Sequence, residues 1–208
     1  MHSTLSKFLT QFQQTFDPPP PARGESQTDW FISGVWSQSL KNWFTDHYPT
    51  IRYEFRVGTT RRWLDAALCH KANVDLDGAN ARMDLAVEWE WDNNKVWSQF
   101  GQGDFRKLFE VAATCGVAIV QTRVDRRRGT EKADDTITQL RELHKRYSVD
   151  CPKRDVAIVE FRRILHTPTE VRFDACYWLN GNDQPRPLGQ WDYAVSRGEA
   201  RRVERSGS

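Results

Sequence analysis

The segment from Arg82 to Trp91 alternates like a β-strand yet carries acidic residues, and it restricts the possible folds more than any other part of the chain. Side chains of a strand alternate between its two faces. The members of the two faces are Leu85, Val87, Trp89 and Trp91 on an apolar face, and Asp84, Ala86, Glu88 and Glu90 on an acidic face. Because buried carboxylates are costly without a compensating cation, the acidic face is either a solvated sheet surface or part of a metal site.

The spacing of the acids decides which of them can share a metal ion. Glu88 and Glu90 lie about 6–7 Å apart along a strand, whereas Asp84 is about 13 Å from Glu88 and too far away. A residue on a paired strand lies only about 5 Å away. If Asp77-Gly78 forms a hairpin turn, Asp65 comes opposite positions 88–90. Asp65, Glu88 and Glu90 are therefore the predicted catalytic and metal-binding set.

Three hard oxygen ligands favour Mg²⁺, with Mn²⁺ as the alternative. Such an ion lowers the pKa of bound water and grips phosphates, so the set is typical of phosphodiester hydrolysis. Asp75, Asp77 or Asp84 takes the place of Asp65 if the hairpin is shorter. Glu54 is a secondary candidate ligand from the strand at 51–57, although a solvent-facing strand position explains it equally well.

Periodicity predicts an α/β (α+β) chain with a mixed central β-sheet flanked by helices. The continuous apolar run at 116–123 indicates a parallel strand covered on both faces, and the helix before it indicates a crossover connection. We expect Asp104 to cap that helix and Gly116 to end it. The expected helices are 3–16, 34–47, 104–114 and 131–147, and the expected strands are 51–57, 62–69, 82–91, 116–123, 156–161 and 170–178.

Length and composition favour one globular domain over residues 1–208, with 38% hydrophobic and 28% charged residues. We expect an N-terminal helical arm at 1–29, whose helix stops before Pro18–Pro21, and a frayed tail at 197–208. No apolar run reaches the roughly 20 residues of a membrane span, and the N-terminus lacks a signal-peptide core. The four dispersed cysteines favour free thiols in a reducing, cytoplasmic compartment.

The net charge of +2 does not by itself indicate a nucleic-acid partner. The second part of the chain, residues 123–208, is more basic, with 18 Lys and Arg against 14 Asp and Glu. Its loop Arg126, Arg127 and Arg128 is a candidate for contacts with DNA phosphates or bases. An ordinary solvated surface accounts for the same residues.

Several of these features, in their order along the chain, resemble the PD-(D/E)xK nuclease superfamily, and more narrowly the BamHI- and BglII-type restriction endonucleases. The motif residues are Asp65, then Glu88-Trp-Glu90, followed by Trp91-Asp-Asn-Asn94. A helix opening at Asp104-Phe-Arg-Lys-Leu and the strand Gly116-Val-Ala-Ile-Val-Gln-Thr-Arg123 come next. The resemblance covers roughly residues 60–125. No proline precedes Asp65, and Glu90 stands where most of the superfamily has lysine.

The resemblance implies a restriction-endonuclease-like core and a Mg²⁺-dependent endodeoxyribonuclease. It implies a second-metal or general-base role for Glu90, and it leaves Lys95 or another basic residue to supply the site's cation. A type II enzyme would act as a homodimer on DNA, with the helices at 3–16 and 34–47 as candidate dimer faces. The alternatives are a nuclease of another defence, toxin or repair system, one acting on RNA, or a non-catalytic nucleic-acid-binding module.

Overall fold

The computed structural model describes the helical N-terminus, the strands and the helices between them. The described residues are 1, 3–15, 48, 50–57, 62–71, 82–90, 103–125, 136–167, 170–182, 184–196 and 199–203. The helix expected at 34–47 and the turn expected at Asp77-Gly78 lie outside these ranges.

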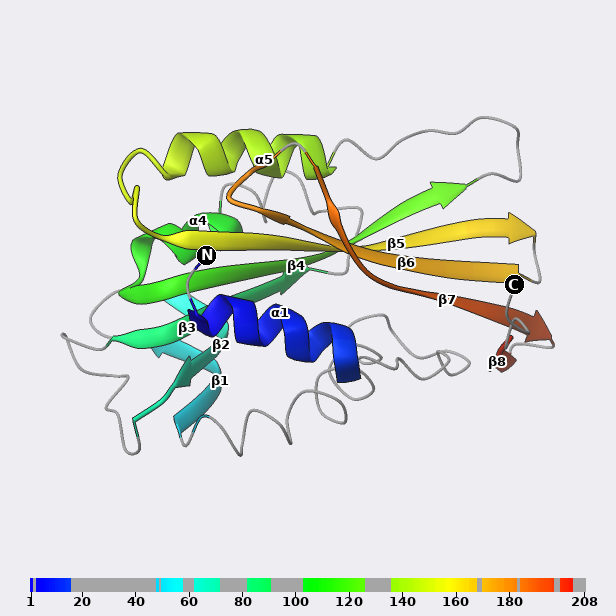
Figure 1. Cartoon of the computed structure of the whole chain (residues 1–208), viewed down its shortest axis with the longest axis horizontal. Helices are drawn as coiled ribbons and strands as arrows, with labels where there is room; N and C mark the ends of the chain where they lie inside the picture. The colour runs from blue at the N-terminus through cyan, green and yellow to red at the C-terminus, as the bar shows by residue number, and fades with distance from the viewer. Residues whose placement is uncertain are drawn as a thin grey trace.

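The described residues form one eight-stranded sheet in which the strands follow each other in chain order, and the three helices among these residues cover it (Figure 1). Strands β1 to β3 are antiparallel, β3 to β5 are parallel, and β5 to β8 are antiparallel again. The sheet is therefore mixed, as expected from the sequence. The elements are α1 (Ser3–Thr15), β1 (Thr50–Val57), β2 (Arg62–Cys69), β3 (Met83–Glu90), α4 (Phe105–Glu110), β4 (Ala113–Asp125), α5 (Thr136–Tyr147), β5 (Asp155–Thr167), β6 (Glu170–Leu179), β7 (Arg186–Ser196) and β8 (Glu199–Arg202).

Two apolar layers hold the helices to opposite faces of the sheet. Helix α1 packs on one face, where Val117 and Ile119 of β4 point. Helices α4 and α5 pack on the other face, where Ala118 and Val120 point (Figure 1). Strand β4 is apolar at successive positions because both of its faces are covered, and its parallel pairing with β3 across α4 confirms the expected crossover.

Helix α1 contributes its whole apolar side to this core. Leu5, Phe8, Leu9 and Phe12 are each at most 3% exposed and lie against the sheet. The exposed positions of the helix include Ser3, Lys7 and Thr10, which are polar. The apolar stripe of this helix is thus used inside the chain.

The structure differs from the expected elements at several places, and it adds the unexpected strand β7. Helix α4 ends at Glu110 and β4 begins at Ala113, so Gly116 lies inside the strand and does not end the helix. A Cβ at Gly116 would approach Leu108 Cβ to 3.3 Å, so glycine there lets α4 lie close to the sheet. Residues 199–202 of the expected frayed tail form β8, because their backbone pairs with β7.

Among the described residues, no helix is both long and apolar enough to cross a membrane. Each of the four cysteines is a free thiol.

Candidate functional site

Asp65 and Glu88 meet across the antiparallel pair β2–β3. The register Ala66↔Val87, continued by one residue, sets Asp65 opposite Glu88. Asp65 Oδ2 accepts a hydrogen bond from the Trp89 backbone N–H at 2.7 Å, which fixes its carboxyl group against β3. Besides burial, the negative charge of Asp65 acts on Glu88 strongly enough to raise the pKa of the Glu88 carboxyl group, so the two groups are close neighbours. Two carboxyl groups from separate strands therefore occupy one place on the sheet.

Both carboxyl groups are difficult to ionise in the metal-free protein. The Glu88 side chain is 1% exposed; burial first, and then repulsion from Asp65, raise its pKa well above the ordinary value. Burial raises the pKa of Asp65 from 3.8 to about 6. Neighbouring carboxyl groups with raised pKa values retain a proton more readily than isolated ones, and a bound cation would oppose this retention.

Helix α4 brings the one cation found among the described contacts of the pair. Lys107 Nζ lies 3.5 Å from Glu88 Oε1 and 3.3 Å from Oε2. The same ammonium is 2.6 Å from Asp104 Oδ1, at the helix start. Its attraction to Glu88 and Asp104 outweighs burial and raises the pKa of Lys107, so it stays charged.

Asp104 has a different partner from the one expected. It occupies the N-cap position of α4, but its side chain makes no capping hydrogen bond. The carboxylate is instead bound by Lys107 one turn later. Asp104 thus fixes the lysine that faces Glu88, and the helix gains the favourable effect of an acid near its N-terminus.

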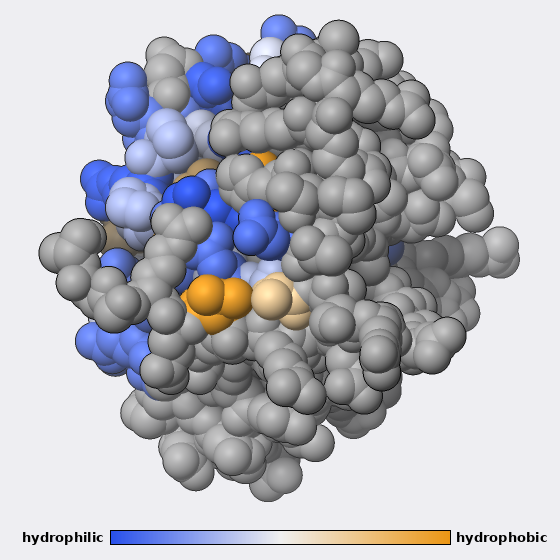
Figure 2. Space-filling view, turned by 90° about the vertical axis from the view of Figure 1, so that its right-hand side faces the viewer, coloured by the Kyte–Doolittle hydropathy of each residue, from blue (hydrophilic) through white to orange (hydrophobic). Residues whose placement is uncertain are grey.

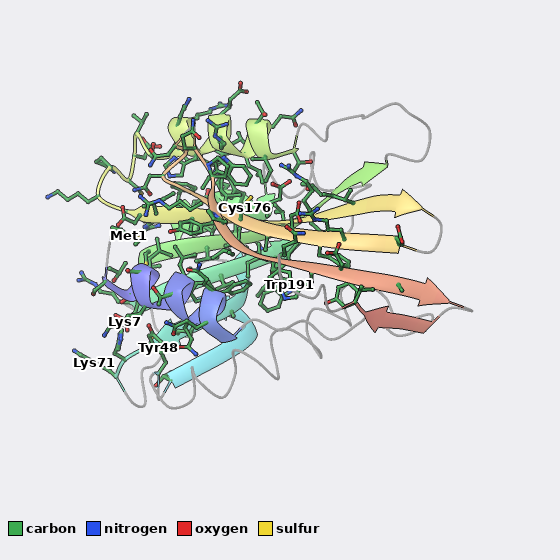
Figure 3. All side chains as sticks on the ribbon, turned by 45° about the vertical axis from the view of Figure 1, so that its right-hand side comes forward. Met1, Lys7, Tyr48, Lys71, Cys176 and Trp191 are labelled. Carbon is green, nitrogen blue, oxygen red and sulfur yellow. The ribbon has the colours of Figure 1, made fainter. Side chains whose placement is uncertain are left out.

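Asp84 is held at the other end of β3 and takes no part in the pair. Its Oδ2 accepts the His70 backbone N–H at 2.6 Å and lies 2.9 Å from His70 Nδ1. The Tyr48 ring lies 4.5 Å from the His70 ring. Figure 3 labels Tyr48 and Lys71 at this end of the sheet, away from Cys176. The distance argument that separates Asp84 from Glu88 agrees with this arrangement.

The remaining candidates from the sequence are only partly described. Glu54 and Glu90 have backbone positions in β1 and β3, and their side chains lie outside the described part. Lys95, the arginine loop and the alternative acids Asp75 and Asp77 also lie outside it; the loop residues are Arg126, Arg127 and Arg128.

The donor set of the pair suits a divalent cation with oxygen preference. Mg²⁺ is commonly held by one or two carboxylates and keeps several waters for substrate phosphates, so Asp65 and Glu88 fit it. Across the described residues, no group of three or more His, Cys, Asp and Glu side chains is placed to hold a metal ion. Within that part of the chain, Asp65 and Glu88 would be the candidate protein ligands of such an ion.

Sequence reasoning did not single out Lys107. A signal was present, because Asp104 and Lys107 are three residues apart on the helix after the acidic strand, a spacing that puts both side chains on one face. That the face turns toward Glu88 depends on how α4 packs.

Comparisons of the chain with models of known protein families, with curated proteins and with solved structures found no match. The chemical interpretation therefore depends on the geometry of Asp65, Glu88 and Lys107.

Proposed function

We propose that this chain is a Mg²⁺-dependent endodeoxyribonuclease of the restriction-endonuclease type. The observation that carries the proposal is the pairing of the buried Glu88 with the partly buried Asp65, with Lys107 bound to the Glu88 carboxylate. Nothing about packing requires two acids to face each other inside a sheet, and the arrangement is unfavourable without a cation. A divalent cation and a phosphate group would complete it.

The order of elements around the pair supports the proposal. Asp65 lies on the second strand and Glu88 on the third strand of an antiparallel set, and α4 and parallel β4 follow. This is the order of motif, helix and apolar strand that the resemblance to restriction endonucleases rests on. The expected core type and the preference for DNA over RNA belong to the same proposal.

The residues take distinct roles in hydrolysis. Asp65 and Glu88, once ionised, would hold the cation, which lowers the pKa of a water and offsets charge on the phosphate. The positive charge of Lys107 lowers the pKa of Glu88 and so makes its carboxyl group easier to ionise. The Trp89 backbone N–H keeps Asp65 oriented. Water attacks phosphorus, the P–O bond to the leaving oxygen breaks, and that oxygen takes up a proton.

Cleavage of supercoiled plasmid with Mg²⁺ or with EDTA tests the proposal, using the parent protein, Asp65→Asn and Glu88→Gln. Glu142→Gln is the matched control, because Glu142 is an exposed acid on α5. We expect cleavage by the parent and the control with Mg²⁺ only. Cleavage in EDTA, or by Glu88→Gln at the parent's rate, would contradict a metal-dependent site at this pair.

Titration calorimetry with MgCl₂ or MnCl₂ gives a readout that is independent of turnover. We expect the heat of binding to be retained in Glu142→Gln and lost in Asp65→Asn. Discrete fragments from plasmid would indicate a site-specific restriction enzyme, and a smear would indicate a nuclease of another system. Preference for RNA over DNA at equal length would refute the deoxyribonuclease assignment.

A further inference from the structure

A second buried carboxylate lies on the same sheet face as the Asp65–Glu88 pair. Glu88 neighbours Ala118 on β4, and Ala118 neighbours Ile158 on β5. Glu160 is two residues beyond Ile158, so its side chain points to the same face. It is 2% exposed.

Hydrogen-bond donors surround the Glu160 carboxylate. Arg162 binds it with two bonds, from Nε to Oε1 at 3.3 Å and from Nη2 to Oε2 at 3.1 Å. The Thr122 hydroxyl donates to Oε1, and the Cys176 thiol donates to Oε2 at 3.6 Å. Figure 3 labels Cys176 near the middle of the sheet. Both carboxylate oxygens of Glu160 accept hydrogen bonds, and the two bonds from Arg162 hold its guanidinium in a fixed position.

Arg162 keeps most of its donors for another partner. Its side chain is 44% exposed, and a guanidinium has five N–H donors, of which the bonds to Glu160 use two. Arg172 is held in a similar way, because its Nε donates to Asp174 Oδ1 at 2.7 Å. Arg162 pairs across the strands with Asp174, so the two arginines are diagonal neighbours, about 7–8 Å apart at Cβ.

The two arginines lie beside the helices and not beneath them. They belong to the second half of β5 and the first half of β6, and Figure 1 shows that β4 to β7 extend past α4 and α5. The described residues seen from that end in Figure 2 are mostly hydrophilic, with only small hydrophobic areas. Two strand spacings and four residues separate Arg162 from Glu88, which amounts to about 16 Å.

We propose that Arg162 and Arg172 form a phosphate-contacting strip that holds the backbone of a DNA duplex beside the Asp65–Glu88 pair. This inference rests on the proposed function for its choice of DNA. Phosphates of one duplex strand rise by about 3.4 Å of axis per step and are further apart along their helical path, so two guanidiniums about 7–8 Å apart match neighbouring phosphates. The strip would contact the duplex a few phosphates from the one at Glu88.

Glu160 holds the Arg162 guanidinium in place before any phosphate binds. A guanidinium loses side-chain entropy when it binds a phosphate, and a buried carboxylate that already fixes Arg162 removes part of this cost. The planar fork of arginine matches phosphate oxygens with two parallel bonds. The negative charge of Glu160 is buried and compensated, and that of Asp174 is paired with Arg172. Arg162 is the most exposed of the four side chains, at 44% against 36% for Asp174 and 26% for Arg172, so its remaining N–H donors face outward.

Binding of a fluorescein-labelled 30-base-pair duplex in EDTA, across a range of NaCl concentrations, tests the strip without cleavage. The two test variants are the single substitution Arg172→Ala and the double substitution Arg162→Ala with Glu160→Gln. We expect each to lower the affinity for the duplex at least about tenfold at low salt. Each should reduce the salt slope by about one. The second variant removes the buried acid together with its partner, so no unpaired charge remains. Lys7→Ala is the control, because Lys7 lies on α1 across the sheet and is exposed (Figure 3).

The outcomes separate this inference from the proposed function. Unchanged salt slopes in both arginine variants overturn the strip, even if the parent cleaves plasmid with Mg²⁺. A slope lowered equally by Lys7→Ala also overturns it, since binding would then follow net charge. Reduced slopes confined to the arginine variants support the strip, even if no cleavage is found. Tighter binding of single-stranded RNA than of the duplex overturns the choice of partner.

Discussion

The two buried glutamates on one sheet face have opposite surroundings. Glu88 is 1% exposed and faces another acid, Asp65, with a single ammonium at 3.3–3.5 Å. Glu160 is 2% exposed. Its carboxylate accepts two hydrogen bonds from Arg162, one from the Thr122 hydroxyl and one from the Cys176 thiol. Burial is almost the same for both, but only Glu160 has enough donors for its oxygens.

This difference supports the distinct roles that we propose for the two acids. A carboxylate with complete hydrogen bonding stabilises the strands around it. Two neighbouring carboxyl groups with raised pKa values are an unfavourable arrangement that a cation relieves. We therefore expect removal of Glu160 to harm folding and removal of Glu88 to harm only the proposed reaction.

The largest expected effect is on cleavage by Glu88→Gln. The amide keeps the shape of the side chain but cannot balance a cation, so the rate with Mg²⁺ should fall about a thousandfold or more. Plasmid nicking under single-turnover conditions measures this. Glu160→Gln should retain cleavage within about tenfold, and an equal loss in both variants would remove the distinction between the two glutamates.

Glu160→Ala should give the largest effect on stability. It leaves the Thr122 hydroxyl buried without its acceptor and opens space beside Cys176, so the free energy of unfolding should fall by about 2–4 kcal/mol. Urea denaturation monitored by tryptophan fluorescence measures it. Glu88→Gln should be neutral or stabilising without metal, and a larger loss there than in Glu160→Ala would contradict the comparison.

Lys107→Met should have a smaller effect on the reaction. It removes the cation that lowers the pKa of Glu88, so Mg²⁺ must displace a more tightly held proton. We expect about ten- to a hundredfold weaker metal binding or slower cleavage, with partial recovery at higher pH. Pre-steady-state rates between pH 6 and 9 test this, with Lys145→Met on α5 as the control for loss of a lysine.

The smallest expected effect is the pH dependence of stability in EDTA. The folded protein holds the Asp65 proton with a pKa of about 6, against 3.8 for the ordinary group. This stabilisation is complete below pH 3.8 and is lost as pH rises through about 6, an effect of at most about 3 kcal/mol. Urea unfolding of the parent and of Asp65→Asn should diverge over this range. A difference that does not change with pH would contradict a raised pKa.

Thermal unfolding with added Mg²⁺ complements the measurement in EDTA. Because the cation binds the ionised pair and only in the folded state, it should raise the midpoint of thermal unfolding more at pH 8 than at pH 5.5. An equal shift at both values would show that binding occurs away from Asp65 and Glu88.

Local sequence patterns predicted much of the fold. The alternation in β1 to β3 and the apolar run in β4 each restrict which faces can be buried, and burial of apolar surface is the main driving force of folding. The pairing of Asp65 with Glu88 followed from the same alternation, since an antiparallel hairpin links the two positions by symmetry. Strands β7 and β8 were missed, because Pro187 and Gly189 break the usual strand pattern and β8 is polar.

The alternation of Leu85, Val87 and Trp89 with acids is visible in the sequence, and it predicts carboxylates on one face of a sheet. The same local alternation puts Glu160 and Arg162 on one face of β5, so the partner of Glu160 follows from local sequence. The partner of Glu88 depends on the tertiary structure, because Lys107 reaches Glu88 where α4 lies close to β4 at Gly116. The packing of that helix arises from long-range contacts that no local pattern encodes.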